Sequence, residues 1–357
     1  MVWSRLAIVA VILILVAPDR AGAQAPPSFP RESVVAAQIQ PSQLNQLKEF
    51  CDHWTGRLAG GTTGAEDALA EVRLARDELV KPLQGAGVAA PSSTFRFEYS
   101  RCLIGALQPI VEGKNSYAAI NALEVAGYLG TDAGVSLAMQ HADAGFESRP
   151  EIRTWAAKAL MIAVQSGGLD AASINRSVRR LERAGLAEED WIPLHSQLAA
   201  LAAVDAAAME ISAIQPVHEA RIKILDSAIT RLDQQHATPE LILAIAPGIM
   251  SLQTEFLRLR PHEQEDVGKM AAPVFGRFLQ AAQNNWDRVR ADDAIRVKFS
   301  QAVNTTEVLL RLIDAEMRQP PPPRPEGARQ AWDQDDRDVF LSVVEKWTDI
   351  LSRSPYQ

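Results

Sequence analysis

Hydrophobic residues recur at intervals of three and four positions along almost the whole stretch 41–319. This spacing places apolar side chains on one face of an α-helix, which has 3.6 residues per turn. The alternation typical of a β-strand occurs only at 93–99, where it leads directly into a helical pattern. Glycine-containing turns at 60–64, 85–87 and 166–168 separate the helices. The pattern therefore predicts an all-α protein.

Three segments within this helical stretch resemble one another: YAAINALEVA (117–126), WAAKALMIAV (155–164) and QLAALAAVD (197–205). Their Ala-Leu pairs recur at similar spacings of about 40 residues, which is typical of a helical repeat. Alanine lets neighbouring helices approach closely, and leucine fills the layer behind it. A helix pair built in this way must stack on another pair to bury its apolar face. The sequence predicts stacked antiparallel helix pairs, an α-solenoid.

The run PEIRTWAAKAL (150–160) resembles the second helix of a HEAT-type repeat, which carries an arginine shortly before an Ala-Leu core. The preceding GYLGTDAGVSLAMQHA (127–142) is similar to the turn and first helix of such a unit. The resemblance covers about 115–205. The third copy lacks the Asp and Arg of the turn, and 206–317 shows no clear repeat. The resemblance implies a curved stack of helix pairs that binds a partner, and it implies no chemistry.

The N-terminus has the order of a cleavable signal peptide. Arg5 is followed by an apolar run from Leu6 to Ala17 and by the small-x-small triplet Ala21–Ala23. Twelve apolar residues are too few to span a bilayer, which needs about 20. We expect cleavage near Ala23 and a periplasmic or extracellular location. An uncleaved N-terminal anchor is the alternative.

The composition is that of an ordinary globular protein, with 47% hydrophobic and 22% charged residues. The formal net charge is −8. An acidic chain without a basic cluster argues against nucleic acid as a partner, because that binding depends on Lys and Arg at the phosphates. The same charge argues against an anionic membrane surface. After the N-terminal run, no stretch is apolar enough to predict an integral membrane segment.

The chain has two cysteines, Cys51 and Cys102. Cys51 belongs to an apolar helical stripe with Phe50 and Trp54, and Cys102 belongs to a second stripe with Tyr99. In an exported protein, two cysteines on the apolar faces of packed helices favour one disulfide. Two buried free thiols are the alternative. Neither cysteine lies in a C-x-x-C motif, so the sequence favours no catalytic thiol.

The C-terminal part contains a proline-rich run, QPPPPRPEG (319–327), which predicts a stiff polyproline II spacer. An adaptor ligand is the alternative for this run. A strongly amphipathic helix follows at about 333–352, and Asp333, Asp335 and Asp336 crowd its N-terminus, where the helix dipole favours them. We expect this helix to dock on the last helix pair, with partner binding as the alternative.

Motifs that carry chemistry are scarce. The six histidines form neither H-E-x-x-H nor H-x-H. The GGTTG run (60–64) is not followed by a lysine and predicts a turn rather than a phosphate loop. The sequence therefore assigns no catalytic, cofactor-binding or metal-binding residue. If the protein were a carbohydrate-active helical enzyme, His141 and Asp143 would be the first residues to inspect, although 6% aromatic content disfavours a sugar cleft.

These observations predict an exported helical-repeat protein whose leading function is that of a non-catalytic scaffold binding a protein partner through the concave face of its solenoid. A carbohydrate-active lyase or glycosidase is the alternative. The predicted organisation is a signal peptide (1–23), a flexible lead-in (24–40), an N-terminal helical segment with the disulfide (41–113), HEAT-like repeats (114–216), a C-terminal helical region (217–318), a proline-rich spacer (319–331) and a terminal amphipathic helix (332–357).

Overall fold

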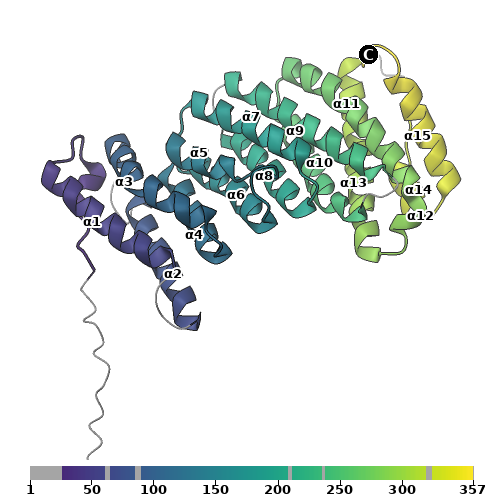
Figure 1. Ribbon diagram of the computed structural model, residues 1–357. Coiled ribbons are helices and arrows are strands. Elements are labelled where there is room, and N and C mark those ends of the chain that lie inside the picture. The colour runs from purple at the N-terminus through teal and green to yellow at the C-terminus, as the bar shows by residue number, and fades with distance from the viewer. Residues whose placement is uncertain are drawn as a thin grey trace, which may run out of the picture.

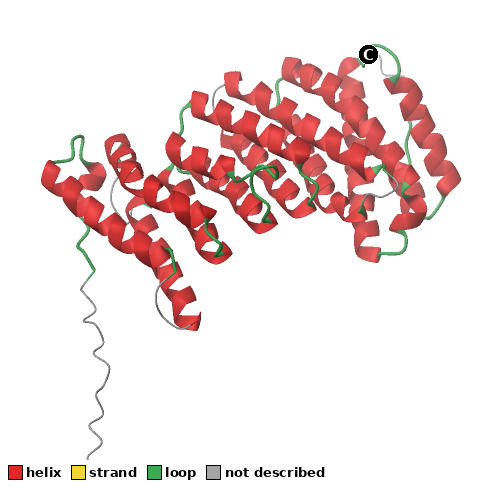
Figure 2. Ribbon diagram, in the orientation of Figure 1, coloured by secondary structure: helices red, strands yellow, loops and turns green. Residues whose placement is uncertain are grey.

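A computed structural model describes residues 26–60, 65–84, 90–207, 211–234, 238–318 and 324–356. Every regular element in these ranges is a helix, as Figure 2 shows. None of the helices in these ranges is long and apolar enough to cross a membrane. The predicted signal peptide and the GGTTG turn after Gly60 lie outside the described residues. The all-α prediction is confirmed.

The helices stack in two layers that run the length of an elongated molecule, from α1 at one end to α15 at the other (Figure 1). Each helix packs against the next one of its own layer and against its chain neighbour in the other layer. Layer A consists of α1 (Pro41–Leu58), α3 (Ser93–Glu112), α5 (Asp132–Gln140), α7 (Ala171–Ala187), α9 (Ile211–Leu232), α11 (Pro261–Asn284) and α15 (Arg337–Leu351). Layer B consists of α2 (Ala65–Val80), α4 (Ser116–Leu129), α6 (Pro150–Gln165), α8 (Trp191–Ala207), α10 (Ile242–Phe256), α13 (Asp293–Met317) and α14 (Ala328–Asp333).

Short elements complete the path of the chain: the 3₁₀ turns η1 (Arg31–Val35), η2 (Lys81–Leu83) and η3 (Pro239–Leu241), and the one-turn helix α12 (Trp286–Val289). Side-chain caps fix several helix starts. The Asn115 side chain accepts hydrogen bonds from the first backbone N–H groups of α4, and Asp170 does the same for α7. Local sequence therefore sets where these helices begin.

Small residues set the distance between α4 and α6, which belong to the predicted repeat. A β-carbon added at Gly127 would lie 2.7 Å from the carbonyl oxygen of Ala159. Ala122, Ala156 and Ala159 are completely buried. The helices approach this closely because their facing side chains have little or no volume. The role predicted for alanine in the repeat agrees with this packing.

The two-layer stacking continues beyond the segment in which the sequence shows a repeat. Helices α9 and α11 pack side by side in layer A, and α10 and α13 do so in layer B. The boundary predicted at 216/217 lies inside α9. The fold is thus an all-α helical-repeat arrangement over its whole described length, although the sequence repeat fades after 205.

The stretch before α1 differs from the expected flexible lead-in. The Phe29 ring lies 5.0 Å from the ring centre of Phe50 and 6.1 Å from that of Phe95. Ser33 is completely buried, and the backbone N–H of Ser92 donates to the Val34 carbonyl at 2.8 Å. Because these contacts join the segment to α1 and α3, residues 29–35 belong to the folded end of the solenoid.

The C-terminal helix α15 docks on α11 and α14, as Figure 1 shows. Its buried side chains are Phe340, Val343, Val344 and Trp347. The prediction of docking in cis is confirmed, although the chain first forms the short helix α14 within the predicted spacer. Residues 319–323 of the proline-rich run lie outside the described residues.

The three aspartates before α15 have separate roles. Only Asp336 caps the helix, by accepting a hydrogen bond from the backbone N–H of Val339 at 3.0 Å. Asp333 ends α14 and accepts from the Ser300 hydroxyl at 2.6 Å, whereas Asp335 pairs with Arg290. The expected role at the start of this helix is therefore confirmed for Asp336.

Candidate functional site

Several helices of layer B carry apolar side chains that are exposed or half-buried. Tyr117, Ile120 and Trp155 are half-buried and pack partly against the core, whereas α8, α10 and α13 each carry an exposed aliphatic side chain. Ile192, Met250 and Val297 are 46%, 45% and 49% exposed. We call this surface the B face and define it by Tyr117, Ile120, Trp155, Ile192, Met250 and Val297.

The middle of the B face combines an aromatic ring with positive charge. The Lys158 ammonium nitrogen lies 4.6 Å from the ring centre of Trp155, one turn earlier on α6. On the neighbouring helix α8, burial lowers the pKa of His195, and the positive charge of Lys158 lowers it further. His195 is therefore neutral at pH 7, one turn from the exposed Ile192.

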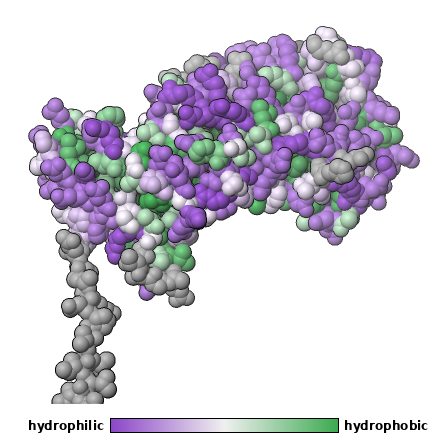
Figure 3. All heavy atoms as spheres, in the orientation of Figure 1, coloured by the Kyte–Doolittle hydropathy of each residue, from purple (hydrophilic) through white to green (hydrophobic). Residues whose placement is uncertain are grey.

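Layer A carries ion pairs between helices on its surface. Ion pairs join its successive helices: Asp132 of α5 with Arg176 of α7 at 2.7 Å, and Glu182 of α7 with Lys223 of α9 at 2.9 Å. Figure 3 shows hydrophilic side chains over the region of α7 and α9. Ion pairs therefore join the successive helices α5, α7 and α9 of layer A, although this layer also exposes Phe97 and Leu186.

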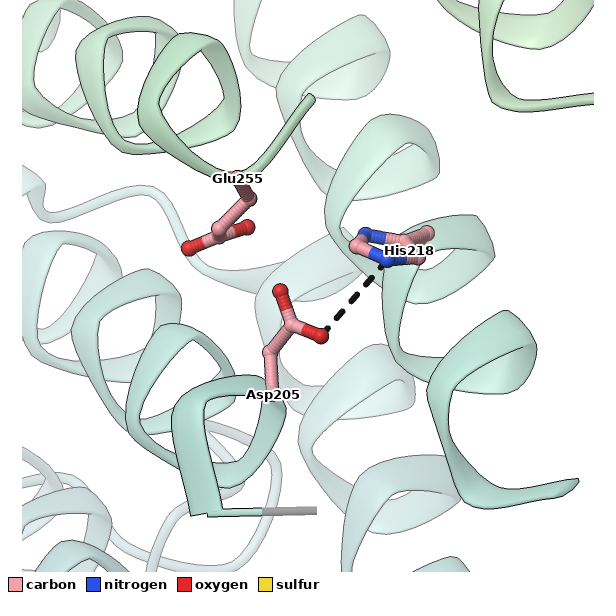
Figure 4. Close-up of side chains that lie close together, drawn as sticks. All are labelled: Asp205, His218 and Glu255. Carbon is pink, nitrogen blue, oxygen red and sulfur yellow. Dashed lines mark ion pairs between the residues drawn. The ribbon is translucent and has the colours of Figure 1, made fainter. Parts of the chain in front are cut away.

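A buried polar cluster joins α8, α9 and α10 (Figure 4). Asp205 of α8, His218 of α9 and Glu255 of α10 each offer an atom within 4.8 Å of the other two. The His218 Nε2 atom lies 3.5 Å from a carboxylate oxygen of Asp205. Burial raises the pKa of Asp205 and lowers that of His218.

One imidazole and two carboxylates are a donor set that zinc accepts, so we tested whether the surroundings suit a divalent cation. The buried Arg221 guanidinium donates to the Glu255 carboxylate, and its Nη1 atom lies 3.4 Å from Asp205. Its other terminal nitrogen donates to the Ser251 hydroxyl at 2.6 Å. Because this cation already uses the carboxylates, the cluster fits an internal ion network better than a metal centre.

Sequence reasoning did not find this cluster, since its members come from three helices. The only local signal is the spacing of His218 and Arg221, which places both on one side of α9. The charge of Arg221 holds this cluster together. Burial lowers the pKa of its guanidinium to about 10, which is still well above neutral pH. The guanidinium therefore remains charged at pH 7, which keeps the two carboxylates paired.

The residues suggested for an enzymatic site do not converge. His141 is buried, and its Nδ1 atom lies 3.1 Å from Glu147. Asp143 instead accepts a hydrogen bond from the backbone N–H of Gly145 at 2.8 Å and faces a shallow surface pocket of about 320 Å³ beside Phe146. His141 thus belongs to the interior and Asp143 to the surface.

The predicted cysteine partners lie together. Cys51 of α1 is completely buried, Cys102 of α3 is half-buried, and the two helices pack side by side. The two side chains lie close enough to shift each other's pKa, upward for Cys51 and downward for Cys102. Both cysteines are free in the structure, so the disulfide stays a prediction while the proximity it requires is present.

No protein-family model matches the chain. No curated protein matches it either. Among solved structures, a chain from work titled "Computational Design of Self-Assembling Cyclic Protein Homooligomers" is similar at 11% identity and a TM-score of 0.22. The match covers 87% of this chain and 96% of that one. A TM-score at this level carries no argument about fold or function.

Proposed function

We propose that this protein is a non-catalytic scaffold of the HEAT-like type, which binds a protein partner through the B face. The observation that carries the proposal is the presence of exposed Ile192, Met250 and Val297 on three successive helices of layer B, α8, α10 and α13. Contiguous apolar surface on a soluble protein marks interaction sites, and solenoids present such surfaces along their length. Trp155 and Lys158 are the central anchors, since aromatic residues dominate binding energies at interfaces.

The HEAT-like assignment rests on the motif around Arg153. This arginine is buried and binds both carboxylate oxygens of Glu188, at 2.7 and 2.9 Å. It also donates to the backbone carbonyls of Glu147 and Ser148. The motif arginine thus ties its own repeat to the turn that begins the next one, which is a structural role that a repeat family would retain.

We further propose that the scaffold acts outside the cytoplasm after cleavage near Ala23. The support is the order of charge, apolar run and small-x-small triplet at the N-terminus. Mass spectrometry of the native protein tests this proposal. A mature chain that begins at Gln24 is the expected result, and an intact N-terminus starting at Met1 would contradict it.

The binding surface is tested by quantitative affinity capture with three baits: the wild type, Ile192→Lys on the B face and Leu186→Lys on layer A. The two substituted residues are matched in chemistry and are 46% and 41% exposed. A lysine placed inside an apolar interface leaves a desolvated charge without a partner. We expect recovery of the partner to fall at least about tenfold for Ile192→Lys alone.

Two results would overturn this proposal. A loss of the partner with Leu186→Lys, but not with Ile192→Lys, would place the interface on layer A. Equal recovery by all three baits, or the absence of any reproducible partner, would remove the B face as a binding surface. Circular dichroism of the three baits checks that the substitutions leave the helical fold intact.

The carbohydrate-active alternative gains no support from the two close carboxylates. Asp205 and Glu255 both contact Arg221, whereas glycosidases place a protonated acid and a second carboxylate on either side of the bond they cleave. His141 and Asp143 lie in different surroundings, as described above. We therefore propose binding rather than hydrolysis.

A further inference from the structure

Cys51 and Cys102 differ in how far their side chains are exposed to solvent. The Cys51 sulfur is completely buried between α1 and α3, whereas Cys102 is half-buried on the second helix and partly open to solvent. Tyr99, one turn before Cys102, is fully buried and donates from its hydroxyl to the Leu79 carbonyl at 2.9 Å. Cys102 is therefore the thiol of the pair that a reagent from solvent can reach.

The two thiols also differ in pKa. The hydrogen bond between the thiols raises the pKa of Cys51, and burial raises it further. The same hydrogen bond lowers the pKa of Cys102 to about 7, against the opposing effects of burial and of Glu98. A substantial fraction of Cys102 is therefore thiolate at neutral pH, and the thiolate is the nucleophile in thiol chemistry.

We propose that Cys51 and Cys102 form a thiol–disulfide exchange site, which a small or protein disulfide oxidises to a crosslink between α1 and α3. The Cys102 thiolate attacks one sulfur of the oxidant, the oxidant's S–S bond breaks, and one thiolate leaves. The Cys51 thiol then gives its proton to the released thiolate, and its sulfur attacks Cys102, breaking the mixed disulfide and expelling the second thiolate. Two protein thiols are oxidised and the oxidant is reduced to two thiols.

The crosslink would join α1 and α3, which belong to the first repeats of the solenoid. The first repeat has a neighbour on one side only, so nearest-neighbour packing stabilises it less than an interior repeat. Closing a loop of about 50 residues constrains the unfolded chain. We expect oxidation to raise the melting temperature of the N-terminal repeats by about 5–10 °C. This inference is independent of the proposed scaffold function.

The test uses the full chain, reduced and then treated with oxidised glutathione, followed by intact-mass spectrometry. The wild type is expected to lose two hydrogen atoms and to retain no glutathione. Cys51→Ala is expected to retain one glutathione on Cys102, because no second thiol resolves the mixed disulfide. Cys102→Ala is expected to react far more slowly, since its remaining thiol is buried.

The rate of the first exchange gives a second readout that a merely structural pair would not show. In the wild type the rate should rise through a midpoint near pH 7, the pKa of Cys102. Cys51→Ala removes the hydrogen bond, so the midpoint should move toward an ordinary thiol and the rate at pH 7 should fall about fivefold. Equal reactivity of the two single variants, or a stable glutathione adduct on the wild type, would overturn the proposal.

Discussion

At the scale of single residues, buried charges in this protein hold the turns between repeats. Glu147 is almost completely buried and accepts hydrogen bonds from the Arg149 side chain at 2.7 and 2.9 Å. Arg149 also donates to the carbonyls of Gly113 and Val111, at the end of α3. One arginine thus satisfies a carboxylate and the carbonyls at a helix end, which bulk water would otherwise solvate.

This network predicts a pH-dependent contribution to stability. Burial alone would raise the pKa of Glu147, but hydrogen bonds from Arg149 and His141 outweigh it and lower the pKa to about 2. Because the folded-state pKa is depressed, the stabilisation is complete above the unfolded value of about 4.5 and is lost as the pH falls toward 2. The urea midpoints of wild type and Glu147→Gln should therefore converge over this interval.

The surface carboxylate Glu263 supplies the control. Hydrogen bonds from Arg260 lower the pKa of Glu263 to about 2 as well, but this pair is exposed. High salt should reduce the loss of stability caused by Glu263→Gln. The loss caused by Glu147→Gln should remain largely intact, because buried pairs are screened less. A gap between wild type and Glu147→Gln that stays constant from pH 6 to pH 2.5 would contradict the assignment.

At the scale of elements, the sequence predicts helices well and the contacts between them poorly. The apolar period identified α6, and the amphipathic stripe identified α15, because each signal is local. The grouping of Asp205, His218 and Glu255 depends on how three helices stack, and no fixed spacing encodes that. The packing of Phe29 onto Phe50 and Phe95 was missed for the same reason, since proline-rich flanking sequence suggests flexibility.

The docking of α15 yields a prediction at this scale. Trp347 is 1% exposed, so Trp347→Ala should destabilise the packing of α15 by about 3–5 kcal/mol. Val339 of the same helix is 46% exposed, and Val339→Ala should change stability by no more than about 0.5 kcal/mol. Hydrogen exchange should show opening of 337–351 in the tryptophan variant. Protection of α15 equal to that of wild type would contradict the docking.

At the scale of the whole molecule, the two layers leave each repeat in contact with its neighbours alone. Stability is then close to a sum of repeat and interface contributions. A weakened interface at the end of such a stack lets only the last repeat unfold separately. A weakened interface inside the stack separates it into two parts that unfold independently. The contact between α4 and α6 is such an interior interface, and its closeness depends on Gly127 and Ala159.

Substitution of Gly127 by alanine tests this division. The added β-carbon would lie 2.7 Å from the Ala159 carbonyl oxygen and 3.0 Å from its α-carbon, so α4 and α6 must move apart at a cost of about 1–3 kcal/mol. Gly105→Ala on α3 is the control, because nothing lies within 4 Å of a β-carbon there and alanine should add about 0.5–1 kcal/mol of helix stability. Calorimetry should show one transition for the control and two for Gly127→Ala, with the repeats before α6 melting first. If Gly127→Ala melted in a single step at a lower temperature, the stack would be cooperative over its whole length and the nearest-neighbour description would fail.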